Sequence, residues 1–151
     1  MSILQPQEKL ELVTRHAEAE LRCDWDGALA TMIDNPFYVH YPLGIRVQGR
    51  EAVKEQWKRL LATPGFAAAA ESANLRHWVL GETLVSMYEW LVDDGNGSER
   101  SMRSYALFTF VDGLIESETI YSEATTDAVM RQALNDEFCS VPGVERLDEV
   151  V

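Results

Sequence analysis

Three long strand-like runs follow one another in the second half of the chain, and they require a sheet against which the remaining elements must pack. The runs cover Thr83–Val92, Arg100–Phe110 and Leu114–Ser122, and β-branched and aromatic residues dominate them. Turns rich in glycine, aspartate and asparagine separate the runs, so we expect an antiparallel meander. Polar residues recur within these apolar runs. Such a pattern indicates either a strand with one solvent-exposed face or a carboxylate in the wall of a pocket.

The most legible turn, Val111-Asp112-Gly113, sets the predicted register of the last two strands. A three-residue loop with glycine in the left-handed conformation places Phe110 opposite Leu114. Continued along the ladder, this register places Ala106 opposite Glu118 on the same face of the sheet. The small side chain of Ala106 leaves room for the carboxylate, which makes Glu118 a candidate site residue. On a solvated face, Glu118 would be an ordinary surface residue.

Helices are predicted for most of the first half of the chain. Apolar residues recur at helical spacing after Pro6, over Trp25–Ile33 and after Gly49, and this periodicity predicts three amphipathic helices. Between the second and third helices, Phe37–Tyr41 predicts a short strand. A further helix is predicted over Thr126–Phe138, and the tail that follows has little pattern.

The order of these elements predicts one α+β domain, with helices covering one face of a curled sheet. We expect residues 1–151 to form a single domain, with a core over about residues 7–123 and a C-terminal helix and tail over residues 124–151. In the first helix, we expect His16 at the edge of the apolar stripe, which consists of Leu10, Val13, Ala17 and Leu21.

Composition limits the partners and the compartment. The net charge of −12 offers no basic footprint for phosphates, so we expect neither nucleic acid nor an anionic membrane as a partner. Cys23 and Cys139 are far apart in the sequence, so no disulfide framework is expected. No apolar run is long enough to span a bilayer, and Met1–Val13 lacks the apolar segment of a signal peptide. We therefore expect a reduced, cytoplasmic protein. The histidines lack metal-ligand spacing, and phosphate and dinucleotide motifs are missing, which predicts chemistry without a metal or cofactor.

Local motifs in this order resemble the nuclear-transport-factor-two-like superfamily, in its SnoaL-like, ketosteroid-isomerase-like and limonene-epoxide-hydrolase-like branch. The motifs are the helix start Asp24–Ala28, the step from Pro42 to Gly49–Val53, and the hairpin Phe108–Ile115 that leads to Tyr121. The resemblance implies a cone in which a curved, mostly antiparallel sheet and three helices enclose an apolar pocket, often within a homodimer. Because this fold serves isomerases, cyclases, hydrolases, binders and interaction modules, it does not define the function.

The chemistry of ketosteroid isomerases is not retained in the matching positions. The carboxylate base of these enzymes corresponds to Tyr41, their oxyanion tyrosine falls near His16, and their oxyanion aspartate falls at Ala106. Moving a proton between two carbons in that subfamily needs the carboxylate base. The chain is therefore not expected to be an ordinary ketosteroid isomerase.

The pattern of the epoxide-hydrolase-like members is partly retained. The arginine and the two aspartates of these enzymes correspond to Met87, Glu89 and Ile120, and their water-orienting residues correspond to Tyr38 and His40. This comparison turns Tyr38 and His40 toward the pocket, whereas the isomerase comparison turns Tyr41 inward. Because side chains alternate along a strand, both sets cannot face the pocket unless a bulge intervenes.

Glu89 is the leading candidate for a proton-transfer group. Facing inward beside Met87 and Leu91, its carboxylate would be desolvated and its pKa raised. In the alternative, this face of the strand forms a dimer interface and Glu89 lies at its rim. Two strands away, Glu118 would stand about 10 Å from it and provide a second acid.

The aromatic and histidine side chains have two interpretations as well. Trp57 and Phe108 either line a pocket for an apolar ligand or belong to the plain core. His16 and His40 either act as proton shuttles and hydrogen-bond donors or are structural.

These observations favour a cofactor-independent enzyme of isomerase, cyclase or hydrolase type that acts on a small lipophilic molecule. Glu89 would transfer the proton, Glu118 would be a second acid, and His40 or Tyr38 would orient an oxygen or a water. The alternatives are a non-catalytic protein that sequesters a small molecule in the same pocket, and a protein-interaction module. A homodimer is expected in every case.

Overall fold

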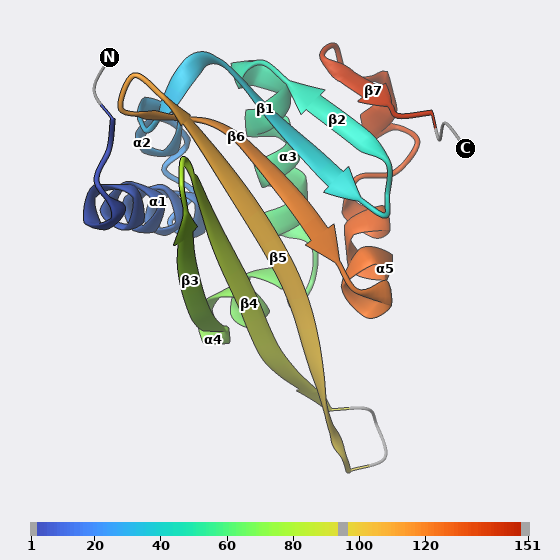
Figure 1. Cartoon of the computed structure of the whole chain (residues 1–151). Coiled ribbons are helices and arrows are strands. Elements are labelled where there is room, and N and C mark those ends of the chain that lie inside the picture. Colours follow the sequence, from blue (N-terminus) through green and yellow to red (C-terminus); the bar gives the residue numbers. More distant parts are fainter. Residues whose placement is uncertain (1–2, 94–96, 149–151) are drawn as a thin grey trace.

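The computed structural model describes residues 3–93 and 97–148 of the chain. Within these residues, seven strands form one curved mixed sheet in the order β3-β4-β5-β6-β1-β2-β7 (Figure 1). The strands are β1 (Met32–Tyr41), β2 (Ile45–Gln48), β3 (Asn74–Leu80), β4 (Thr83–Asp93), β5 (Glu99–Val111), β6 (Leu114–Ser122) and β7 (Val144–Arg146). The helices are α1 (Pro6–Leu21), α2 (Trp25–Ala30), α3 (Arg50–Ala62), α4 (Phe66–Ser72) and α5 (Ala124–Ala133), followed by the 3-10 turn Phe138–Ser140.

The helices pack on one face of the sheet, and the predicted α+β architecture is confirmed. Strands β1 and β6 run parallel to each other, whereas every other neighbouring pair is antiparallel. Helix α3 contacts β1 and β2, α1 contacts β6, and α5 contacts β5 and β6, while the β4–β5 hairpin extends beyond the helices (Figure 1). No helix among the described residues is long and apolar enough to cross a membrane.

The buried face of α1 differs from the predicted one. The predicted stripe is only partly buried, and the most deeply buried positions are Lys9, Leu12, Val13, His16 and Ala19. His16 therefore lies at the centre of the buried face, where only 1% of its surface is exposed, and not at its edge. A buried imidazole requires hydrogen-bond partners, so its position already indicates a polar network beneath α1.

The second predicted helix is too long at its C-terminal end. Helix α2 ends at Ala30, and Met32 already belongs to β1, which runs through Pro36 to Tyr41. The prediction failed because the apolar residues Met32 and Ile33 fit a helix and a strand equally well in so short a run. The register between β1 and β6 shifts between Met32 and Phe37, and this irregularity accommodates the proline inside the strand.

The predicted register of the β5–β6 hairpin is wrong. Asp112 and Gly113 both have positive φ angles, of 49° and 82°, so the turn has two residues and closes on the pair Val111 and Leu114. The register then shifts once more between Thr109 and Phe110. As a result Ala106 pairs with Ile120, and Glu118 pairs with Phe108.

The chain after α5 adds a strand that the sequence did not predict. Helix α5 ends at Ala133, earlier than predicted, and Val144–Arg146 forms β7 beside β2. Gly143 allows this approach: a Cβ atom at this position would lie 2.2 Å from the carbonyl oxygen of Gln48. The amide of Gln48 donates a 2.8 Å hydrogen bond to the carbonyl of Gly143. A residue with a side chain would therefore push the C-terminal segment off the sheet edge.

Candidate active site

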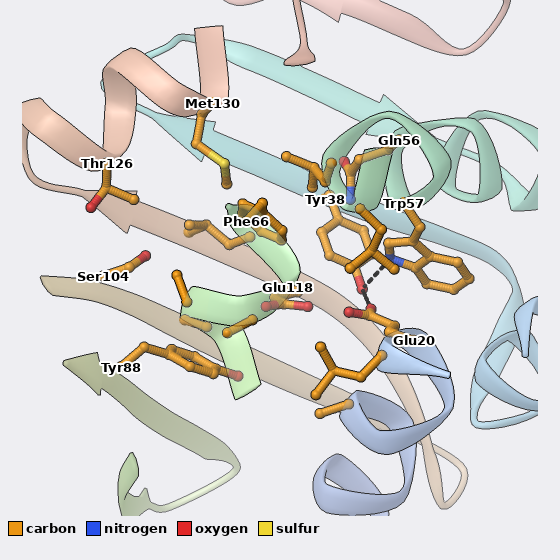
Figure 2. A pocket seen from close by; sticks show the side chains of 18 of the residues that line it. Glu20, Tyr38, Gln56, Trp57, Phe66, Tyr88, Ser104, Glu118, Thr126 and Met130 are labelled. Atoms are coloured by element: carbon orange, nitrogen blue, oxygen red, sulfur yellow. Dashed lines mark hydrogen bonds between the residues drawn. The ribbon is translucent and has the colours of Figure 1, made fainter. Parts of the chain in front are cut away.

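A cavity of about 170 Å³ lies between the concave face of the sheet and helices α1, α3, α4 and α5 (Figure 2). Apolar and aromatic side chains form most of its wall, among them Trp57, Leu60, Phe66, Tyr88, Trp90, Ala106, Ile120 and Met130. Polar side chains enter this wall from several elements: Glu20, Tyr38, Gln56, Ser104, Glu118 and Thr126. The cavity is large enough for a molecule of one or two rings.

Glu118 is the most perturbed of these groups. It alternates with Thr119 along β6, so it shares the inner face with Ile120 and lies beside Tyr38 of β1. Only 7% of its surface is exposed. Burial raises the pKa of the Glu118 carboxyl to about 8, the charge of Glu20 adds to this effect, and the charge of His16 opposes it. At pH 7 the carboxyl is therefore mostly protonated.

His16, Glu20 and Tyr38 form a hydrogen-bonded triangle beside Glu118. His16 and Glu20 lie one turn apart on α1, and Nε2 of His16 is 2.8 Å from Oε1 of Glu20. The Tyr38 hydroxyl donates a 3.0 Å hydrogen bond to the same carboxylate oxygen and lies 3.0 Å from Nε2 of His16. Trp57 Nε1 donates to the Tyr38 oxygen from the other side, over 3.3 Å (Figure 2).

The partners of His16 determine where its protons lie. The Thr31 hydroxyl donates to the carbonyl of Ala28 over 2.6 Å, so its oxygen accepts from Nδ1–H of His16 over 2.7 Å. On the other side of the ring, a proton must lie between Nε2 and the Glu20 carboxylate, since two lone pairs would otherwise meet at 2.8 Å. Burial lowers the pKa of His16, but the charge and hydrogen bond of Glu20 outweigh it, so that the pKa is raised overall.

Tyr38 connects this triangle to the cavity without acting as an acid itself. Burial, followed by the charges of Glu118 and Glu20, raises the pKa of the Tyr38 hydroxyl well above its usual value. The hydroxyl therefore keeps its proton at every physiological pH and serves as a fixed hydrogen-bonding group. Its contacts hold the Glu20 carboxylate and the His16 ring in place next to Glu118.

His16, Glu20 and Glu118 form the one group of histidine and acidic side chains within residues 3–93 and 97–148 that lie close enough together to hold a metal ion. The ligand atoms of His16, Glu20 and Glu118 lie within 4.8 Å of one another. However, the contact between His16 and Glu20 contains a shared proton that a cation would have to displace. We therefore interpret the cluster as a proton-holding network.

His40 lies on the same inner face of β1 but behind the cavity wall. Its Nε2 is 2.8 Å from Oε1 of Gln56, a residue of α3 that lines the cavity. Burial lowers the pKa of His40 to about 4, and the hydrogen bond to Gln56 and the charge of Asp127 only partly offset this effect. The ring is therefore neutral at pH 7, and it lies behind the lining residues Gln56 and Tyr38.

Glu89 does not lie in the cavity wall, contrary to the expectation from the sequence. Tyr88 and Trp90 line the cavity, so the alternating side chain of Glu89 points to the outer face of the sheet. There its carboxylate pairs with Nε of Arg103 over 2.6 Å and accepts from the Ser101 hydroxyl over 3.1 Å. The hydrogen bond from Arg103 and that from Ser101 lower the pKa of Glu89, where the sequence predicted a raised one.

The structure also separates the other candidates. Tyr38 and His40 face inward, whereas Tyr41 faces outward and stacks on Tyr121, which resolves the conflict between the two family comparisons. Met87 shares the outer face of β4 with Glu89, and Phe108 is buried in the core outside the cavity lining. The candidates that the structure brings together at the cavity are Trp57, Ala106, Glu118 and Ile120, with Tyr38 and, behind it, His16.

Two important polar residues were missed by sequence reasoning. Glu20 has one visible signal, because a histidine and a glutamate four residues apart meet on one face of a helix. Gln56 has no such signal, since a lone glutamine within a helix pattern is usually exposed. Only the packing of α3 against β1 shows that it is fully buried.

Comparisons with known proteins agree with this fold. The family model of the SnoaL-like domain matches residues 13–118. A putative polyketide cyclase from Xanthomonas campestris pv. campestris is 22% identical, with a TM-score of 0.58 over 84% of this chain and 97% of that one. TerC, co-crystallised with polyporic acid, is 17% identical, with a TM-score of 0.56 over 82% of this chain and 98% of that one.

A third similar structure is an NTF-2-like protein of unknown function from Burkholderia xenovorans LB400, 18% identical with a TM-score of 0.58, covering 78% of this chain and 84% of that one. Comparison with the curated proteins finds no match. At these identities the solved structures support the fold alone, whereas the family match extends over most of the chain. The protein belongs to the SnoaL-like domain family, within the NTF2-like fold.

Proposed function

We propose that the protein is an acid–base enzyme of isomerase or cyclase type that moves a proton on a small, largely apolar molecule held in the cavity. The observation that carries this proposal is the Glu118 carboxyl, which is buried in an apolar wall next to a network that already holds protons. Perturbed acids of this kind concentrate at functional sites. Proton transfer needs no further group from outside the chain.

The reaction that fits Glu118 is the reversible removal of a proton next to a carbonyl. The ionised carboxylate takes the proton from carbon, the C–H electron pair forms the enolate, and negative charge develops on the ligand oxygen. The protonated carboxyl then returns the proton to the same carbon or to another one, so the enzyme ends unchanged. A pKa of about 8 suits this role because a general base works best near the ambient pH.

The triangle behind Glu118 has a supporting role in this mechanism. When Glu118 is ionised, the positive charge of His16 stabilises the carboxylate and partly offsets the larger repulsion by the charge of Glu20. Tyr38 keeps the pair in place through its two contacts. His16, Glu20 and Tyr38 are thus positioning residues, and Glu118 is the catalytic one.

A non-catalytic binder of the same kind of molecule is the second candidate. It is favoured by the protonated state of Glu118 at neutral pH, because a neutral carboxyl in an apolar wall is also a good hydrogen-bond donor to a ligand. The two candidates differ in whether the ligand loses a proton while it is bound.

Deuterium exchange tests the proposal without knowledge of the natural substrate. 2-Tetralone is a two-ring ketone with acidic protons next to its carbonyl, and ¹H NMR in D₂O follows their replacement by deuterium. We expect the protein to accelerate this exchange above buffer, and Glu118→Gln to abolish the acceleration. Glu89→Gln is the matched control, because it neutralises an acid on the outer face and should leave exchange unchanged.

Two results would contradict the enzyme. If 2-tetralone binds, as measured by calorimetry, but exchanges no faster than in buffer, the binder is favoured. If Glu118→Gln exchanges as fast as the wild type, the proton is moved by another group.

A further inference from the structure

We propose that Gln56 is a ligand-binding residue whose side-chain amide donates a hydrogen bond to a carbonyl oxygen of the molecule in the cavity. The inference deepens the proposed function: Gln56 would hold the oxygen of the ligand while Glu118 faces the neighbouring carbon. It rests on that function only in placing a small carbonyl compound in the cavity.

Gln56 is held in an unusual environment for an amide. It lies on α3 one residue before Trp57, lines the cavity, and is fully buried. Its oxygen is 2.8 Å from Nε2 of His40, while its nitrogen has no hydrogen-bond partner within the described part of the chain. Figure 2 shows the amide with its oxygen turned away from the cavity and its nitrogen on the cavity side, above the Tyr38 ring.

His40 determines which end of the amide meets the ligand. The imidazole is neutral, and its Nε2–H donates to the amide oxygen, so the amide nitrogen is left to face the cavity. The ring is itself fixed between β1 and α3 and stacks on Tyr38, with centroids 6.2 Å apart. His40 is therefore a positioning residue for Gln56.

A buried amide N–H without a partner is destabilising, and a ligand oxygen that satisfies it recovers the loss. Among the other polar groups of the wall, Glu20 and Tyr38 already bond to each other and to His16. Gln56 and Thr126 are the lining residues that keep an unpartnered buried polar atom within the described part of the chain. Of the two, Gln56 places its amide nitrogen above the ring of Tyr38, the neighbour of Glu118 on β1, and can donate to a ligand carbonyl there. The ligand class that fits both Gln56 and Glu118 is a compact, apolar ring compound with a carbonyl and a hydrogen on the adjacent carbon.

The test compares 2-tetralone with tetralin, the hydrocarbon of the same shape that lacks the carbonyl. We expect the wild type to bind the ketone about ten-fold or more tightly than the hydrocarbon, and Gln56→Met to lose most of this preference while still binding tetralin. Because the methionine also removes the acceptor for His40, a second variant is needed. Gln56→Glu keeps an oxygen toward His40, and its buried carboxyl can still donate a proton to the ketone while it is neutral. It should therefore retain part of the preference at pH 5 and lose it at alkaline pH, where the carboxyl ionises.

Two further measurements separate this role from a purely structural one. In ¹⁵N–¹H spectra, the side-chain amide signals of Gln56, identified by their loss in Gln56→Met, should move with 2-tetralone but not with tetralin. His40→Phe, which frees the amide to rotate, should reduce the preference for the ketone and leave tetralin binding unchanged.

The proposal is overturned if the ketone preference is retained in Gln56→Met, if it disappears in Glu118→Gln instead, or if the wild type binds neither compound at millimolar concentration. The enzyme proposal has a different readout, since it fails when a bound ketone does not exchange its protons. A protein that binds 2-tetralone through Gln56 without exchange would therefore support the present inference and contradict catalysis.

Discussion

Replacing Glu118 by glutamine should make the protein more stable at alkaline pH. The folded carboxyl has a pKa of about 8, against 4.5 for an ordinary glutamate, so between these values the folded chain keeps a proton that the unfolded chain releases. Because the unfolded state binds fewer protons, the free energy of unfolding falls as pH rises through this window. One pKa unit corresponds to about 1.36 kcal/mol, so the full loss over this window is on the order of 5 kcal/mol.

Glutamine has a similar shape and cannot ionise, so the variant should not show this loss. Urea unfolding at pH 5, 7 and 9 measures the difference. We expect Glu118→Gln to resemble the wild type at pH 5 and to exceed it by several kcal/mol at pH 9. The pKa of His16 is also raised, which lowers the stability of the wild type as pH rises above 6.5. Most of this effect comes from Glu20 and is present in both proteins, whereas the smaller part due to the charge of Glu118 is absent from Glu118→Gln.

Glu89→Gln provides the control with the opposite sign. The pKa of Glu89 is lowered by Arg103, so its contribution is present above the usual carboxyl pKa of 4.5 and is lost as pH falls. Its replacement should reduce stability at neutral pH and give no gain at pH 9. If the wild type and Glu118→Gln instead have parallel stability curves from pH 5 to 9, Glu118 does not hold a proton in the folded state and the reasoning about the cavity is refuted.

Two further predictions concern catalysis and assembly. The rate of 2-tetralone exchange should rise with pH and level off above about pH 8, as Glu118 ionises, whereas Glu118→Gln should show only the buffer profile. Trp78 and Tyr121 lie on the outer side of the sheet with 45% and 47% of their surfaces exposed, so we expect a homodimer through this face, and Tyr121→Glu should halve the mass measured by light scattering. A monomeric wild type, or a variant of unchanged mass, would contradict the dimer.

The architecture could be predicted because its signals are local. Strand propensity, helical periodicity and the order of the elements predicted the α+β fold, and the structure confirms it. What failed were the features decided by tertiary contacts. The end of α2 and the strand Val144–Arg146 depend on pairing with distant segments, and no local pattern contains that information.

The hairpin shows how a wrong register can still lead to a useful site prediction. The turn was shorter than predicted by one residue, and the shift between Thr109 and Phe110 displaced the ladder by one more. Two shifts of one residue amount to two, which is the repeat of a strand. Ala106 and Glu118 therefore still share a face, although Ala106 faces Ile120 and not the carboxylate.

The prediction that Glu89 lies in the cavity was wrong because its face of the strand was assigned from apolar neighbours alone. Met87 and Leu91 do share its face, as predicted, but this is the outer face, where Leu91 is largely exposed. An apolar row on a strand indicates burial against something, and here the sequence gives no means to tell the cavity from a surface that a second subunit would cover. The ion-pair partner of Glu89 could not be predicted either, because Arg103 becomes its neighbour only through the pairing of β4 with β5.

The polar groups of the cavity also explain why its active end is difficult to read from sequence. A buried polar group lowers the stability of the fold unless it has hydrogen-bond partners. His16 finds them in Thr31 and Glu20, and the oxygen of Gln56 finds one in His40. These partners come from different elements and meet only in the folded protein. In the cavity wall, burial keeps the Glu118 carboxyl protonated, and the amide nitrogen of Gln56 has no hydrogen-bond partner within the described residues. A folded protein can keep such groups where a ligand supplies the missing hydrogen-bond partner or receives the proton. A proton-transfer residue and the donor that binds the ligand oxygen are therefore best sought among the cavity groups whose hydrogen bonds are incomplete.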